Sequence, residues 1–324
     1  MGLEYGAGGR LYIQITIILL GVLVVCPFSA EAQEDSFMQE SLVMVHGQDS
    51  AINQICLDIG YKLKSVSVSS CMHAALSESH ETSVKGRPIV TREYPPLHNK
   101  AAQARILLVG GIHGDELSSV SIVFNWMKKL DRYHSGLFHW HIFPALNPDG
   151  LLHNPSTRVN AHGVDLNRNF NTPNWQYESS EYWHKRTHDD VRRYPGPAAL
   201  SEPESRLLAD EIAAFRPHAI VSVHAPYGVL DFDGPPQGPS QLGQLHVQLL
   251  GTYPGSLGNY AGEQLKIPVI TIELPYAGIM PSEQEQSRMW IDLIHWLKTH
   301  IPKQETLLAI RHWELEAGSV TQGE

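Results

Sequence analysis

Cysteine is scarce in this chain, and basic residues are outnumbered by acidic ones. The 324 residues include three cysteines, 24 Lys and Arg, and 34 Asp and Glu, for a formal net charge of −10. Because phosphate binding needs concentrated positive charge, this balance argues against a nucleic-acid partner. No internal repeat or low-complexity tract is visible, and nothing in the composition indicates disorder or a fibre. A hydrophobic content of 42% is enough to bury a large core in one main domain.

An apolar run over residues 11–25 follows Arg10, and the small-residue pattern Ala30-Glu31-Ala32 comes soon after it. This arrangement is typical of a secretory signal peptide, which we predict over residues 1–32. A transmembrane anchor is the alternative, but the run is short for a membrane span. Lipid attachment at Cys26 is a further alternative, which the bulky Val25 before it disfavours. We therefore expect an exported protein, periplasmic or secreted, with no stable membrane anchor.

Cys56 and Cys71 would be the cysteines left after cleavage, and they lie 15 positions apart. Export to an oxidising compartment permits a disulfide between them. Closing a loop of this length stabilises a fold by about 3 kcal/mol in the chain-entropy model. Two unpaired buried cysteines are the alternative. A metal site at this pair is disfavoured, because no further cysteine or histidine stands at zinc-finger spacing.

The remainder of the chain divides into three predicted segments. Residues 33–85 form an N-terminal extension, with a helix at 52–61 and a strand at 64–69. Residues 86–300 form the main domain, and residues 301–324 form a C-terminal tail.

Strand-like and helix-like stretches alternate through the main domain. Strands are expected at 106–110, 139–144, 219–224 and 268–274, and helices at 116–131, 202–215, 241–250, 257–265 and 283–300. This alternation predicts an α/β fold with a mixed central β-sheet and helices on both faces. A polar and aromatic insertion at 171–200 shows little periodicity, and insertions of that length usually form functional rims or lids.

Ionisable side chains follow the ends of the predicted strands. His113 and Glu116 come after the first strand, while His224 and Glu273 end two later ones. Two imidazoles and one carboxylate form a zinc site with an open fourth position, so we predict one zinc ion held by His113, Glu116 and His224. This donor set favours zinc over calcium or magnesium. Glu273 is the carboxylate left over, and beside the metal it could act as general base and general acid.

Two arginines and two aspartates complete the candidate site. Arg158 and Arg168 lie in a polar segment, where one could hold an anionic end of the substrate and the other the developing oxyanion. Asp231 and Asp233 follow His224, and they are the candidate partners of a substrate ammonium group that the family resemblance given next implies. A turn rich in Asp, Gly and Pro is the structural alternative for these two aspartates.

Taken in order, these residues resemble the zinc carboxypeptidases of the carboxypeptidase A type. The resemblance spans roughly residues 84–297 and rests on H-x-x-E at 113–116, N-P-D-G at 147–150, Arg158, GVDLNRNF at 163–170, His224 and Glu273. It implies that Asn167 and Arg168 bind the terminal carboxylate of the substrate. It also implies that Arg158 polarises the scissile carbonyl and that Glu273 is the general base.

Within that family the chain is similar to the bacterial murein peptide amidases. The likeness lies in a short loop between Arg158 and Asn167, in SEPES at 201–205 and in YPGSLGNYAGEQLKIPVITIELP at 253–275. It implies hydrolysis of the amide between γ-D-glutamate and meso-diaminopimelate, so a peptidoglycan-derived peptide is the expected partner. The export signal departs from those enzymes, which are typically cytoplasmic. An exported form could trim peptides still attached to the wall.

Three other functions stay open. A general secreted metallocarboxypeptidase would act on protein or peptide C-termini and would differ in its side-chain pocket. A deacylase of acylated amino acids is disfavoured by the paired Asn167 and Arg168, which suit a free α-carboxylate. A non-catalytic peptidoglycan-binding module is disfavoured because the full set of catalytic residue types is present.

Overall fold

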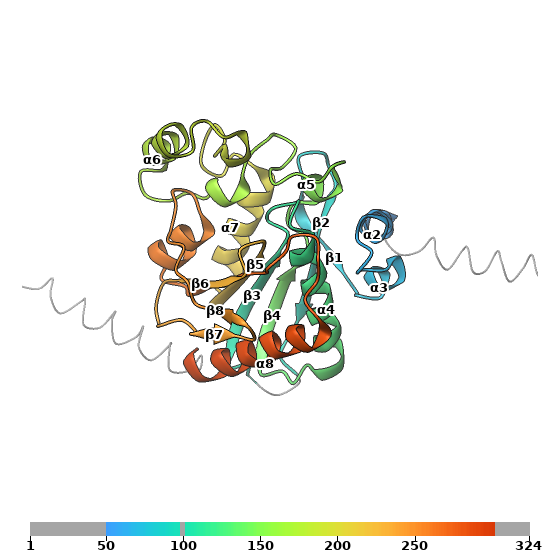
Figure 1. Ribbon diagram of the computed structural model, residues 1–324. Helices are drawn as coiled ribbons and strands as arrows, with labels where there is room; N and C mark the ends of the chain where they lie inside the picture. Colours follow the sequence, from blue (N-terminus) through green and yellow to red (C-terminus); the bar gives the residue numbers. More distant parts are fainter. Residues whose placement is uncertain (1–49, 98–100, 302–324) are drawn as a thin grey trace, which may run out of the picture. The chain divides into compact units, whose positions relative to one another are not determined.

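The computed structural model describes residues 50–97 and 101–301 (Figure 1). The predicted signal peptide, the alternative lipidation residue Cys26 and the predicted tail from residue 302 onward lie outside these ranges. Among the described residues, no helix has both the length and the apolar character that a membrane span requires.

A mixed sheet of seven strands forms the centre of the fold, in the order β1-β2-β4-β3-β5-β9-β6. The central strands β4, β3, β5 and β9 run parallel, whereas β1, β2 and β6 are antiparallel to their neighbours. The strands are β1 (Ser77–Thr82), β2 (Pro88–Tyr94), β3 (Ala104–Gly110), β4 (Phe138–Phe143), β5 (Ala219–His224), β6 (Val229–Asp233) and β9 (Val269–Glu273). The four parallel strands are those that the sequence predicted.

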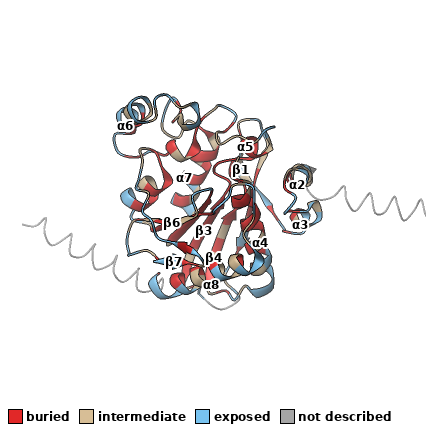
Figure 2. Cartoon of the chain, in the orientation of Figure 1, coloured by how far each residue is buried: buried red, intermediate tan, exposed pale blue. Residues whose placement is uncertain are grey.

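Helices cover both faces of this sheet, as predicted. The longer ones are α2 (Ser50–Lys62), α4 (Leu117–Tyr133), α7 (Pro203–Phe215) and α8 (Glu283–His300). Short helical segments are α3 (Val68–Met72), α5 (Pro148–Leu152), η1 (Leu166–Arg168) and η4 (Gly258–Gln264). Figure 2 shows the buried residues concentrated in the strands and on the helix sides that meet them.

Side-chain alternation along β3 divides the interior into two cores. Ile106 and Leu108 pack in one core with residues of α4 and α8. Leu107 and Val109 pack in the other core with residues of α7 and η4. A parallel strand buried on both faces reads as a continuous apolar run, which explains why the sequence revealed it.

The predicted disulfide is confirmed, and it joins Cys56 in α2 to Cys71 in α3. The strand predicted at 64–69 is wrong. The Ser67 hydroxyl accepts a hydrogen bond from the backbone N–H of Ser70 and caps α3, so the chain turns into a helix there. The boundary predicted at residue 85 falls between β1 and β2, and the segment before it therefore supplies an edge strand to the sheet.

The helix predicted at 241–250 is also wrong. A small hairpin of β7 (Gln241–Leu242) and β8 (Leu245–His246) occupies its first half. Gly243 adopts a φ of +59° in the turn, and its N–H donates to Asp292 of α8. Leu242 and Leu245 have helical spacing, yet the hairpin buries both of them in the core that contains α8. The helix predicted at 257–265 is found as η4.

The insertion at 171–200 forms short helical segments, α6 (Trp175–Glu181), η2 (Tyr182–Arg186) and η3 (Val191–Arg193). Trp175 ties the insertion to η1 by donating to the carbonyl of Arg168, whereas Trp183 donates to the carbonyl of Asp190 within the insertion. The insertion therefore packs against the loop that carries η1.

Candidate active site

The loop after β3 carries His113 and Glu116 to the carboxyl edge of the parallel strands. Gly111 turns the chain with a φ of +64°, a conformation that favours glycine. A Cβ on Gly114 would collide with the backbone of Gly150, so the loop also needs glycine there. Glu116 then stands at the N-cap of α4. Glycines therefore surround the histidine in GGIHGDE because the turn and the close approach of Gly150 both require them.

His224 ends β5 and completes a buried cluster with His113 and Glu116. The His113 Nδ1 lies 2.8 Å from Glu116 Oε1, and the His224 Nδ1 lies 3.0 Å from Glu116 Oε2. The two Nδ1 atoms lie 3.1 Å apart. Two ring nitrogens and a carboxylate thus converge, as the sequence predicted.

The other ring nitrogen of each histidine has its own partner. The His113 Nε2 lies 3.0 Å from Asp165 Oδ1, and the His224 Nε2 lies 2.9 Å from Ser222 Oγ. Partners of this kind fix the tautomer of a metal-binding histidine and orient its ring. With each Nε2 engaged, the Nδ1 atoms are left to face the cluster.

Asp165 links the histidine to the candidate arginine. Its Oδ2 accepts a hydrogen bond of 3.0 Å from Arg158 Nε, and Arg158 Nη1 lies 3.6 Å from Glu116 Oε1. Burial alone would raise the pKa of Asp165, but Arg158 and His113 hold it well below its ordinary value. Asp165 was not among the residues singled out from the sequence, although it lies within GVDLNRNF.

Glu273 ends β9, where it pairs in register with His224 of β5. Glu273 is 7% exposed, and within the described part of the chain its Oε2 has no hydrogen-bond partner. Burial raises the pKa of Glu273, and the negative charge of Glu116 raises it further, while His224 lowers it. A buried carboxylate oxygen without a partner beside this cluster suits proton transfer.

Arg168 and Asn167 lie on η1, in the same cavity wall. Arg168 is 4% exposed, and its guanidinium carbon lies 4.4 Å from the centre of the Tyr253 ring. Its Nη1 donates to the carbonyl of Asn167, while its Nε has no hydrogen-bond partner among the described residues. Asn167 Oδ1 accepts from the N–H of Leu257, which leaves its amide nitrogen as a donor.

Asp231 and Asp233 lie on β6, so the turn considered as their structural explanation is wrong. Period-two alternation places both on the same face of the strand, with Asp231 opposite Thr271 of β9. Burial raises the pKa of Asp233 to about 7, and the charges of Asp231 and Glu263 add to this effect. A Cβ on Gly258 would collide with Asp233 Oδ2, so η4 packs closely against this carboxylate.

A cavity of about 320 Å³ brings the candidate residues together. Its lining includes His113, Arg158, Asn167, Arg168, His224, Asp231, Asp233 and Glu273. Glu116 lies behind the two histidines and is in contact with both. The cavity also includes Arg193 from the insertion, which the sequence reasoning did not single out.

The N-P-D-G segment at residues 147–150 contacts the loops that carry the site residues. Asn147 Nδ2 donates to the carbonyls of Ile112 and Arg158, so it ties together the loops that carry His113 and Arg158. Asp149 binds Arg87 and the N–H of Lys85 from the hairpin of β1 and β2. Both side chains therefore fix the backbone near the cluster.

Comparison with known proteins agrees with this geometry. A family model described as zinc carboxypeptidase matches residues 71–230. Murein peptide amidase A of Vibrio campbellii (strain ATCC BAA-1116) is 31% identical over 204 residues, which cover 61% of this chain and 78% of that protein. This chain belongs to the zinc carboxypeptidase family. As a zinc carboxypeptidase it is a peptide hydrolase.

Further relatives support the same family. Murein peptide amidase A of Escherichia coli (strain K12) is 29% identical over 227 residues, covering 68% of this zinc carboxypeptidase and 90% of that protein. The crystal structure of the murein-tripeptide amidase from Escherichia coli O157 is 28% identical, with a TM-score of 0.50 and coverage of 70% and 93% of the two chains. Carboxypeptidase A from Helicoverpa armigera is 20% identical, with a TM-score of 0.54 and coverage of 74% and 69%, and shows the shared fold.

The donor set of this zinc carboxypeptidase fits the family's metal. Two imidazole nitrogens and one carboxylate match a catalytic zinc site that keeps an open position. The two histidines border the cavity, which Glu273 and Arg158 also line.

Proposed function

We propose that this protein is an exported zinc-dependent amidase that hydrolyses the bond between γ-D-glutamate and diaminopimelate in cell-wall peptides. Two lines of reasoning support the proposal. Relatives about 30% identical carry the name murein peptide amidase A. One cavity also combines a buried arginine with two aspartates beside the candidate metal cluster, and this combination is the observation that carries the proposal.

The metal centre is proposed to use His113, Glu116 and His224 to hold one zinc ion. The chemistry that zinc supplies in such a site is Lewis acidity toward a carbonyl and activation of water near neutral pH. Arg158 lines the cavity next to this cluster and is placed to donate to the scissile carbonyl oxygen as negative charge develops on it.

Glu273 is the proposed general base and general acid. Its unpartnered Oε2 takes a proton from the attacking water and then delivers it to the departing amine. Its raised pKa matches this task, because a group that both accepts and donates a proton works best with a pKa near the working pH.

Asn167 and Arg168 are proposed to hold the free carboxylate next to the scissile bond. The buried guanidinium has an Nε without a partner among the described residues, and a carboxylate would satisfy it. Diaminopimelate bears a second ammonium group at the far end of its side chain. Asp231 and Asp233 are the proposed partners of that ammonium, because they are acidic, buried and part of the same cavity.

Export is proposed from the signal-peptide pattern at residues 1–32. The disulfide between Cys56 and Cys71 supports it, because structural disulfides persist in oxidising compartments. Outside the cytoplasm, the substrate would be wall peptide or fragments released from the wall.

A second candidate is a secreted carboxypeptidase for protein or peptide C-termini. The acidic end of the cavity favours it as well, because Asp231 and Asp233 would also suit a C-terminal lysine.

Kinetics on two peptides would separate these functions. We expect kcat/KM for L-Ala-γ-D-Glu-diaminopimelate to exceed that for an α-linked peptide ending in lysine. Asp231→Asn with Asp233→Asn should weaken the first activity, while the exposed Asp210→Asn serves as the matched control. Preference for the α-linked peptide would contradict the proposal and favour the general carboxypeptidase.

A further inference from the structure

A second cavity, of about 180 Å³, adjoins the candidate metal cluster. It shares Arg158, Arg193 and Tyr227 with the cavity of about 320 Å³ described above, the main cavity. Glu116 also lines the second cavity. Asn167, Arg168 and the two aspartates of β6 line the main cavity but are not part of the second one. The two cavities therefore meet at the cluster and have different ends.

The proposed function assigns the second cavity to the acyl side of the substrate. The residue released by hydrolysis fills the main cavity, where Arg168 takes its carboxylate. The scissile carbonyl, which belongs to the acyl group, lies at the cluster next to Arg158. The acyl group must leave the cluster in another direction, and the second cavity borders the cluster through Glu116 and Arg158.

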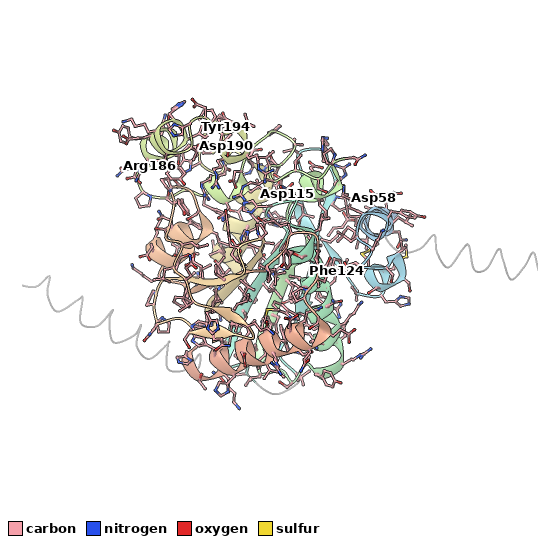
Figure 3. All side chains as sticks on the ribbon, viewed as in Figure 1. Asp58, Asp115, Phe124, Arg186, Asp190 and Tyr194 are labelled. Carbon is pink, nitrogen blue, oxygen red and sulfur yellow. A yellow bond between two sulfur atoms is a disulfide. The ribbon has the colours of Figure 1, made fainter. Side chains whose placement is uncertain are left out.

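The insertion supplies two adjacent arginines to this second cavity, and their surroundings differ. Arg192 Nη2 lies 2.7 Å from Asp115 Oδ2, which engages its charge in an ion pair. Arg193 Nε lies 3.6 Å from Asp190 Oδ2, a looser contact. Asp115, which precedes α4, and Asp190, which precedes η3, are labelled in Figure 3. Arg193 is the arginine of this pair that also lines the main cavity.

Arg193 lies at the junction of the cavities, because it lines both of them. Its charge is close enough to lower the pKa of Arg168, although burial is the main cause of that shift. Its side chain is 33% exposed, so a substrate group entering from solvent can reach it. Three guanidinium groups and three carboxylates line the second cavity, and Arg193 is the arginine with the looser ion pair of the two from the insertion.

We propose that Arg193 binds the free α-carboxylate of a γ-linked D-glutamyl group on the acyl side of the scissile bond. The inference rests on the proposed function and specifies how the acyl side is recognised. In a γ-linked glutamyl peptide, a short aliphatic chain joins the scissile carbonyl to a carbon that bears a free carboxylate. An α-linked peptide carries neutral amides on that side of the bond. A guanidinium at the junction of the two cavities therefore distinguishes γ-linked from α-linked substrates.

Two substrates that differ in one group test this inference. L-Ala-γ-D-Glu-diaminopimelate is compared with the same peptide whose glutamyl α-carboxylate is a carboxamide. We expect kcat/KM of the unmodified enzyme to favour the free carboxylate by roughly 10- to 100-fold, the usual range for a charge-assisted contact in a partly desolvated site. Arg193→Gln should remove most of that preference, and Arg193→Lys should keep part of it.

Lys185→Gln is the matched control, because it removes one positive charge from the same insertion at an exposed position that lines neither cavity. It should keep the preference. Affinity for the two peptides, measured by calorimetry in a Glu273→Gln background, gives a readout independent of turnover. Thermal unfolding of Arg193→Gln shows whether the variant is folded.

Three results would overturn the inference. Retention of the full preference by folded Arg193→Gln would refute the role of Arg193 while leaving the proposed function intact. If Arg193→Gln lost the discrimination between diaminopimelate and lysine as the released residue but kept the preference for the free carboxylate over the carboxamide, Arg193 would be assigned to the released residue instead. Absence of any hydrolysis of the unmodified peptide by the unmodified enzyme would refute the proposed function, and the inference with it.

Discussion

His224 and Glu273 are the last residues of two neighbouring parallel strands, and they stand opposite each other in the register of β5 and β9. One belongs to the candidate metal cluster, and the other is a buried carboxylate with an unpartnered oxygen among the described residues. The backbone of the sheet thus sets the spacing between the proposed metal centre and the proposed base. Loop movement alone cannot separate them.

Glu273→Gln should abolish turnover while preserving metal binding. The amide keeps the shape of the side chain but cannot accept the proton, so we expect a loss of about 100-fold or more in kcat. Zinc content measured on the purified variant should equal that of the unmodified protein. A variant with near-normal kcat would show that another group is the base.

Asp165→Asn should weaken metal binding. Asp165 holds the Nε2 of His113, and loss of such a partner typically costs about 10- to 100-fold in metal affinity. Affinity is measured by competition with a chelator of known strength. Asp210→Asn, on the exposed side of α7, should leave the affinity unchanged. Equal affinities in both variants would contradict the supporting role of Asp165.

Binding of a substrate with a distal ammonium should strengthen as the pH rises through about 7. The pKa of Asp233 is raised to about 7, so the carboxyl is protonated and neutral below that pH and ionised above it. The ammonium needs the ionised form. Binding of the substrate therefore becomes tighter as the pH rises, up to about pH 10, where the ammonium itself loses its proton.

Calorimetry in a Glu273→Gln background would check this pH dependence without interference from catalysis. Asp233→Asn should flatten the pH profile for the diaminopimelate peptide. A peptide ending in alanine lacks the ammonium and should show no such rise. A flat profile in the protein that retains Asp233 would contradict its pairing with the substrate.

Replacing both Cys56 and Cys71 by serine should lower the free energy of unfolding without changing the site. The disulfide closes a loop with a sequence separation of 15, for which the chain-entropy model gives about 3 kcal/mol. Neither cysteine lines the main cavity, so kcat/KM measured below the unfolding transition should be unchanged. Urea denaturation of both proteins provides the comparison.

The central strands and the residues at their ends could be predicted, because each strand is buried on both faces. Ile106, Leu107 and Leu108 form part of a continuous apolar run, and a polar residue after such a run must lie at the edge of the sheet. The edge strands were not visible in the same way. The segment that became β6 reads as a turn because Asp, Gly and Pro follow it, although its alternation places Asp231 and Asp233 in the cavity.

Some candidate residues carry no local signal. Asp165 is distinguished by its contact with His113, which lies 52 positions away in the chain. Arg193 lines the cavity through the packing of the insertion, which Trp175 ties to the carbonyl of Arg168, and a segment without periodicity does not reveal such packing. The histidines and carboxylates at and after strand ends could be found from their residue types, whereas the partners of these side chains depend on tertiary structure.

The most direct test of the account is mass spectrometry of L-Ala-γ-D-Glu-diaminopimelate after incubation with the purified protein. The account predicts release of free diaminopimelate that stops when a chelator removes the metal and returns when zinc is added. Release that persists without metal, or no release from this peptide together with rapid cleavage of α-linked C-termini, would contradict it.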